Sequence, residues 1–127
     1  MQKVILLDIG GVMDVDWEKS TTLIKEVVSK FDASIRLISL MNNPKEVFLE
    51  KSQWHDAPLN ETVNKFDVEE WIDAYGAEHC VAVDDQLGRD EFGQVNPEYV
   101  KNYSVILVDK NVGLSENDIS VIKERWS

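Results

Sequence analysis

Acidic and hydroxyl side chains follow the apolar segments of this sequence. Asp8, the pair Asp84 and Asp85, and Asp109 come after three such segments, and Ser39 closes another. Carboxylates gathered at one edge of a sheet repel one another unless a cation lies between them. Mg²⁺ is the natural cation, because it takes oxygen ligands from one or two carboxylates, water and phosphate. Aspartate is also common after strands because it starts turns and caps helices, so spacing alone leaves a metal site and a structural role equally open.

The elements that must position these residues alternate along the chain. Apolar runs without alternation are typical of strands buried on both faces of a parallel sheet, and they occur at residues 3–7, 34–40, 80–83 and 104–108. Helical spacing and capping residues predict helices over residues 17–31, 45–52, 67–75, 97–103 and 116–126. Such alternation predicts an α/β fold with a parallel sheet and helices on both faces. Ligands bind such sheets at the carboxyl ends of the strands.

Length and charge narrow the classes of function. The 127 residues, 43% hydrophobic and 29% charged, predict one globular domain over residues 1–127. A net charge of −11 argues against non-specific binding to nucleic acids or anionic membranes.

The lone cysteine, Cys80, lies in an apolar run and suits a reducing compartment. The apolar run 4–7 is too short for a signal or spanning segment, so the cytoplasm is the expected location.

Four segments resemble the motifs of the haloacid dehalogenase-like superfamily of hydrolases. Residues 4–13, Val-Ile-Leu-Leu-Asp-Ile-Gly-Gly-Val-Met, resemble its first motif, an apolar strand that ends in a nucleophilic aspartate. Ser39, Lys65 and the pair Asp84 and Asp85 are similar to the second, third and fourth motifs, in the right order. The resemblance covers nearly the whole chain. It implies a three-layer, Rossmann-like fold of the compact kind, since the motif spacing leaves no room for a sizeable cap domain.

The resemblance also implies roles for these residues. Asp8 would attack phosphorus and form an aspartyl-phosphate, which water then hydrolyses. Mg²⁺ would be held by Asp8, the Gly10 backbone carbonyl and the acidic pair Asp84 and Asp85. Ser39 would donate a hydrogen bond to a phosphoryl oxygen, and Lys65 would neutralise charge in the transition state. The partner would be a phosphorylated substrate, and an open site without a cap suits macromolecular or terminal phosphates or protein partners.

Gly10 is a departure from this pattern. Most phosphatases of the family have a second aspartate there, which protonates the leaving group and later activates water, and such a group contributes about 10²- to 10⁴-fold. Asp14 and Asp16 lie further along the loop, and Asp16 is expected to cap a helix. Three possibilities follow: a slow phosphatase, a hydrolase for another leaving group, or a binding or regulatory protein without turnover. A receiver-like signalling domain fits less well, because a receiver carries its acid pair after its first strand.

Overall fold

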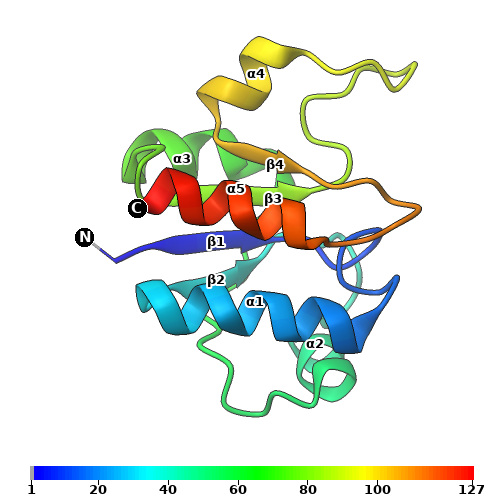
Figure 1. Ribbon diagram of the computed structural model, residues 1–127. Helices are drawn as coiled ribbons and strands as arrows, with labels where there is room; N and C mark the ends of the chain where they lie inside the picture. The colour runs from blue at the N-terminus through cyan, green and yellow to red at the C-terminus, as the bar shows by residue number, and fades with distance from the viewer. Residues whose placement is uncertain (1) are drawn as a thin grey trace.

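The computed structural model describes residues 2–127 and has one parallel sheet between layers of helices (Figure 1). In chain order the elements are β1 (Val4–Leu7), α1 (Trp17–Phe31), β2 (Ser34–Leu37), α2 (Pro44–Ser52), the 3₁₀ turn η1 (Lys65–Asp67), α3 (Val68–Tyr75), β3 (Cys80–Asp84), α4 (Pro97–Asn102), β4 (Val105–Leu107) and α5 (Glu116–Trp126). The strand order is β2-β1-β3-β4, and every neighbouring pair is parallel. The α/β fold and the parallel sheet expected from the sequence are confirmed.

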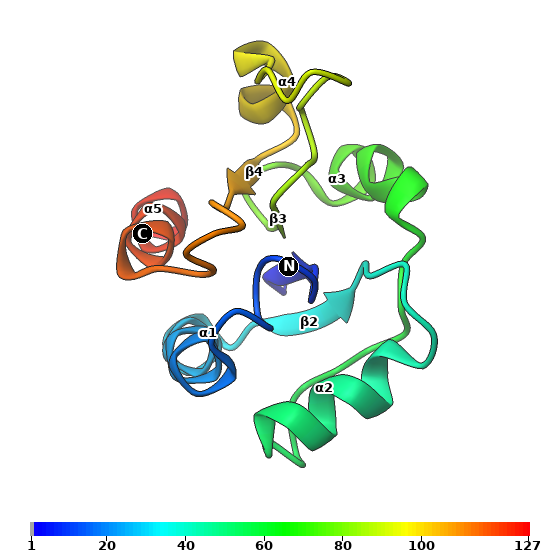
Figure 2. The same cartoon turned by 90° about the vertical axis from the view of Figure 1, so that its right-hand side faces the viewer.

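Helices cover both faces of the sheet. Helices α1 and α5 pack together on one face, and α3 lies against the other (Figure 2). Strand residues alternate between the faces: Ile5 and Leu7 pack with α1 and α5, whereas Val4 and Leu6 pack with α3. Because both faces of these strands are buried, their sequences are continuous apolar runs.

An irregular segment, residues 57–63, runs beside the outer edge of β2. Backbone hydrogen bonds join Ile35 to Pro58 and Asn60, and the Val63 N–H donates to the Leu37 carbonyl at 3.0 Å. The sequence predicted no partner for this edge, because the segment is polar and has no strand pattern. This segment runs parallel to β2, so its last residues lie at the carboxyl ends of the strands.

Two local expectations differ from the structure. The second strand ends at Leu37 rather than at Leu40, although the Ile38 N–H still donates to Leu7. The helix expected over residues 67–75 starts at Val68, and Asp67 makes no side-chain capping bond to it. Instead Asn64 accepts a hydrogen bond from the Phe66 N–H, because a 3₁₀ turn comes first.

The chain leaves β1 and β3 in opposite directions across the sheet. After β1 it passes to β2, and after β3 it passes to β4, on the other side. The carboxyl ends of β1 and β3 therefore form the topological switch point, where parallel α/β sheets bind ligands.

Candidate metal centre and active site

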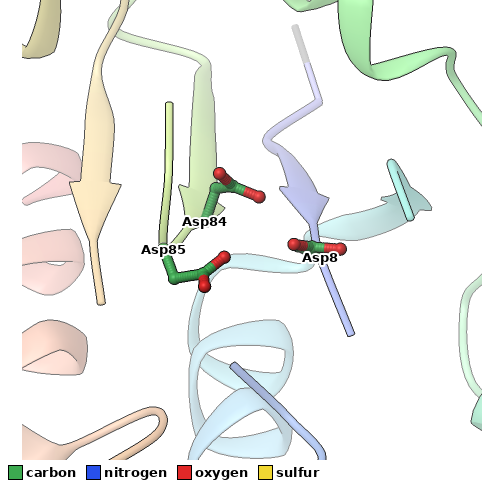
Figure 3. A group of neighbouring side chains, drawn as sticks. All are labelled: Asp8, Asp84 and Asp85. Atoms are coloured by element: carbon green, nitrogen blue, oxygen red, sulfur yellow. The ribbon is translucent and has the colours of Figure 1, made fainter. Parts of the chain in front are cut away.

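Three carboxylates meet at the switch point. Asp8 follows β1, Asp84 ends β3 and Asp85 comes next, and all three are buried. One ligand oxygen from each lies within 4.8 Å of the others. Figure 3 shows the three side chains gathered between the ends of the two strands.

Strand register brings Asp8 and Asp84 together. Leu7 pairs with Val83, and the Asp8 N–H donates to the Val83 carbonyl at 3.0 Å, so Asp8 and Asp84 stand side by side. Both belong to the set of alternate residues that faces α3. The Asp8 Oδ1 atom accepts from the Ile9 N–H at 2.9 Å, which fixes the carboxylate at the strand end.

Lys65 reaches the same point from the start of η1, just after the segment beside β2. Its Nζ atom lies 2.9 Å from Asp84 Oδ1 and 3.2 Å from Asp8 Oδ2. Lys65, to which the resemblance gives a role beside Asp8, therefore contacts two of the acids. Three carboxylates and one ammonium leave a deficit of positive charge in a buried place, which favours a divalent cation.

Asp84 is oriented by backbone groups that sequence reasoning missed. Its Oδ2 atom accepts from the Gln86 and Leu87 N–H groups, both at 2.8 Å. The residue types at these positions do not indicate such donors, because every residue except proline has a backbone N–H group. Oδ1 is left facing Lys65, buried and without a well-aligned hydrogen bond within residues 2–127.

Asp85 points to the other side of the strand end, against Gly11. Gly11 has a φ of 74°, and a Cβ there would lie 2.5 Å from Asp85 Oδ2. A glycine is therefore required both by the turn and by this close approach. The sequence carried this signal in the Gly10-Gly11 pair, but only the structure shows that Asp85 is the group that needs the space.

Burial and mutual repulsion shift the acids apart in pKa. Burial first, and then the hydrogen bond and the charge of Asp84, raise the pKa of Asp8 from 3.8 to about 7. Burial acts on Asp84 too, but its close approach to Asp8 and to the Lys65 ammonium outweighs burial and lowers the pKa of Asp84. Burial and the charge of Asp84 raise the pKa of Asp85. Asp8 and Asp84 thus titrate as a pair that holds one proton below neutral pH.

The remaining candidates lie around this cluster. Ser39 is half-buried in the loop after β2, and its Oγ atom accepts from the Met41 N–H at 3.3 Å. Within the described chain, no hydrogen bond joins Ser39 to the three acids. Gly10 lies in the turn after β1, and a Cβ there would have nothing within 4 Å. Asp109 accepts from the Asn111 N–H in its own turn and is not part of the cluster.

The two aspartates considered as replacements for the missing acid have local partners. Asp16 accepts from the Lys19 N–H at 3.1 Å and caps α1, as predicted. Asp14 accepts from the Gly11 N–H at 2.9 Å, which closes the turn after β1. Neither side chain belongs to the acid cluster.

The three carboxylates could hold a divalent cation such as Mg²⁺. Ligand oxygens lie about 2.1 Å from Mg²⁺, so two of them are no more than about 4.2 Å apart. The carboxylate oxygens, within 4.8 Å of one another, need only small shifts to reach that separation. Within residues 2–127, the buried Oδ1 atom of Asp84 has the Lys65 ammonium 2.9 Å away but no well-aligned hydrogen bond, so this oxygen can still ligate a cation.

Comparisons with protein-family models, with curated proteins and with solved structures found no match to this chain. None of the helices in residues 2–127 combines the length and the apolar character that crossing a membrane requires. The cluster of acids and Lys65 is therefore the evidence on which a functional proposal rests.

Proposed function

We propose that this protein is a Mg²⁺-dependent phosphohydrolase of the haloacid dehalogenase-like type, with Asp8 as its nucleophile. The observation that carries the proposal is the contact of Lys65 with both Asp8 and Asp84 at the switch point of the sheet. A lone carboxylate after a strand is ordinary. Two carboxylates that share an ammonium and adjoin a third, at the place where such folds bind ligands, match the resemblance seen in the sequence.

The proposed reaction has two steps. A carboxylate oxygen of Asp8 attacks phosphorus, the bond from phosphorus to the ester oxygen breaks, and the leaving group departs with the electron pair. Water then attacks phosphorus of the aspartyl-phosphate, which frees Asp8 and releases inorganic phosphate with the proton from water. Asp8 must be ionised to attack, and its raised pKa means that a neighbouring positive charge helps to ionise it.

The other residues stabilise charge. Asp8, Asp84 and Asp85 would hold Mg²⁺, with the Gly10 carbonyl added by the resemblance. When bound, the ion would offset repulsion between the nucleophile and the phosphate. Lys65 neutralises charge that builds on the phosphoryl oxygens. Ser39 accepts from Met41, so its O–H is free to donate to one of those oxygens.

Gly10 supports a second candidate, a binding or regulatory protein of the same fold with little or no turnover. Gly10 stands where the resemblance expects the acid that protonates the leaving group, and Asp14 and Asp16 are engaged in local hydrogen bonds. A bound phosphate ester would then be retained rather than cleaved.

Phosphatase activity on an aryl phosphate, with and without Mg²⁺, tests the first candidate. Asp8→Asn should abolish Mg²⁺-dependent release of phosphate. Asp109→Asn is the matched control, since Asp109 also follows a strand but lies outside the cluster. Activity that survives in Asp8→Asn would exclude the covalent mechanism. Bound phosphate ester without turnover in the wild type would favour the binding protein.

A further inference from the structure

A groove of about 600 Å³ begins at Lys65 and extends away from the acids, between η1 and the loop that joins β3 to α4. Its walls include Lys65, Phe66, Leu87, Arg89, Val95 and Tyr99. Its size is that of a small-molecule site. Two features join it to the acid cluster: Lys65 contacts Asp8 and Asp84, and the Leu87 N–H donates to Asp84.

The side chain of Phe66 stands open at this groove. It is 83% exposed, although it directly follows Lys65 in the chain. Its backbone is held in η1, where its N–H donates to Asn64 Oδ1 at 2.9 Å. An aromatic ring kept exposed on a fixed turn gains from any flat apolar group that covers it. Tyr99 and Val95 supply further apolar surface in the same groove.

Hydrogen bonds within the loop that joins β3 to α4 fix the opposite wall of the groove. Arg89 donates to the carbonyls of Asp85 at 3.0 Å and Gly93 at 2.9 Å, which closes the loop on itself. Asp90, the carboxylate of the groove, already accepts from the Phe92 and Gln94 N–H groups. The groove is therefore shaped before a ligand arrives.

The charge of the groove differs from that of the chain. Two cations, Lys65 and Arg89, face one carboxylate, Asp90, whereas the chain as a whole carries a net charge of −11. Because Lys65 also pairs with Asp8 and Asp84, the groove attracts an anionic ester once a divalent cation offsets the acids.

We propose that this groove binds the leaving group of the phosphate ester and selects an aromatic one, with its ring against Phe66. The proposal rests on the phosphohydrolase function proposed above. With the phosphoryl group at Lys65 and the acids, the continuous groove is where the ester substituent extends. Phe66 thus acts as a specificity residue that contacts substrate and takes no part in bond breaking.

Phosphonates, which cannot be hydrolysed, separate binding from chemistry. We expect phenylphosphonate to bind the Mg²⁺-loaded protein roughly tenfold more tightly than methylphosphonate in calorimetric titrations, from ring burial and stacking. Phe66→Ala should remove most of this preference. Phe92→Ala is the matched control, because Phe92 is 82% exposed but does not line the groove. Neither exposed side chain supports the core, so both variants should fold.

The outcomes distinguish the two proposals. Equal binding of the two phosphonates, or a phenyl preference that persists in Phe66→Ala, would overturn the aromatic groove and leave the phosphohydrolase standing. Failure of both phosphonates to bind would contradict both proposals. A kinetic measurement controls for the acidity of the leaving group. It compares phenyl phosphate with a fluorinated alkyl phosphate whose alcohol is as acidic as phenol. Phe66→Ala should raise KM for the phenyl ester alone; an equal effect on both esters would contradict ring recognition.

Discussion

The carboxylates of Asp8 and Asp84 stand side by side across the β1–β3 pair, and the ammonium of Lys65 lies within 3.2 Å of both. This arrangement places an excess of negative charge where little water reaches. The behaviour of the site should therefore follow the protonation of Asp8 and the supply of cations.

The stability of the protein should fall as pH rises between the ordinary and the raised pKa of Asp8. The folded state holds a proton on Asp8 up to about pH 7, whereas the unfolded chain loses it near 3.8. The folded state therefore binds more protons in this window, and the free energy of unfolding decreases with rising pH. Asp8→Asn should flatten the slope, which denaturant unfolding below, within and above the window measures.

Two neighbours bear on this pH prediction. The lowered pKa of Asp84 acts below its ordinary value of 3.8, where stability is lost as pH falls, and so lies outside the window. Asp85, whose pKa is raised, contributes in the same direction as Asp8 and remains in the variant. Asp109→Asn should keep the wild-type slope. The same slope in Asp8→Asn would show that another group carries the proton.

Mg²⁺ should raise the melting temperature by binding the folded state. At a concentration of one hundred times Kd the stabilisation is about 2.7 kcal/mol. Asp84→Asn should remove the shift, because it takes away a buried ligand, and Asp109→Asn should retain it. Binding should also tighten as pH rises through about 7, since the cation must displace the proton of Asp8. An equal thermal shift in wild type and Asp84→Asn would place the ion elsewhere.

Phosphatase activity should be low and should depend strongly on the leaving group. An aryl oxide leaves without protonation, whereas an alkoxide needs a proton that Gly10 cannot supply. Gly10→Asp should improve alkyl phosphates more than aryl ones, by up to about 10²-fold. Its backbone φ lies outside the left-handed region, and the space beyond its Cα is open, so the substitution should be accommodated. Comparison of kcat/KM for both ester types in both proteins checks this; equal gains would show that leaving-group protonation is not what Gly10 lacks.

Gly11→Ala should weaken metal binding as well as stability. The added Cβ would lie 2.5 Å from Asp85 Oδ2, so the carboxylate must move. The left-handed backbone alone costs about 1–2 kcal/mol. Gly93→Ala measures the cost of the left-handed backbone alone, because Gly93 has a φ of 80° but open space around it. Thermal unfolding and Mg²⁺ titration of both variants measure the difference; identical losses would mean that Asp85 does not need this space.

The sequence was most informative where burial determines residue type. The run Val4–Leu7 predicted its strand because both faces of the sheet are covered, and the alternation of elements predicted parallel pairing. Asp8 and Asp84 were predicted to lie at the same edge because parallel strand ends converge there, and the structure places them side by side. Cys80, which lies in one of the apolar runs, is buried in the structure.

Features that depend on backbone donors or tertiary contact left no such pattern. The N–H groups of Gln86 and Leu87 orient Asp84, and any residue could have supplied them. The segment 57–63 pairs with β2 only through contacts that the fold creates. The early end of β2 has a similar origin, because its pairing with β1 stops where β1 itself ends, at Leu7 opposite Leu37.

That segment also protects the sheet. Without it, β2 would be an edge strand with open N–H and C=O groups, a template on which another chain could add a strand and aggregate. The hydrogen bonds from residues 57–63 to Ile35 and Leu37 cover these groups, and the chain continues from this segment directly into η1, where Lys65 contacts the acids. If this segment detaches from β2, Lys65 should leave the site and the edge of β2 should be exposed to strand addition at the same time. Loss of activity and self-association should therefore appear together.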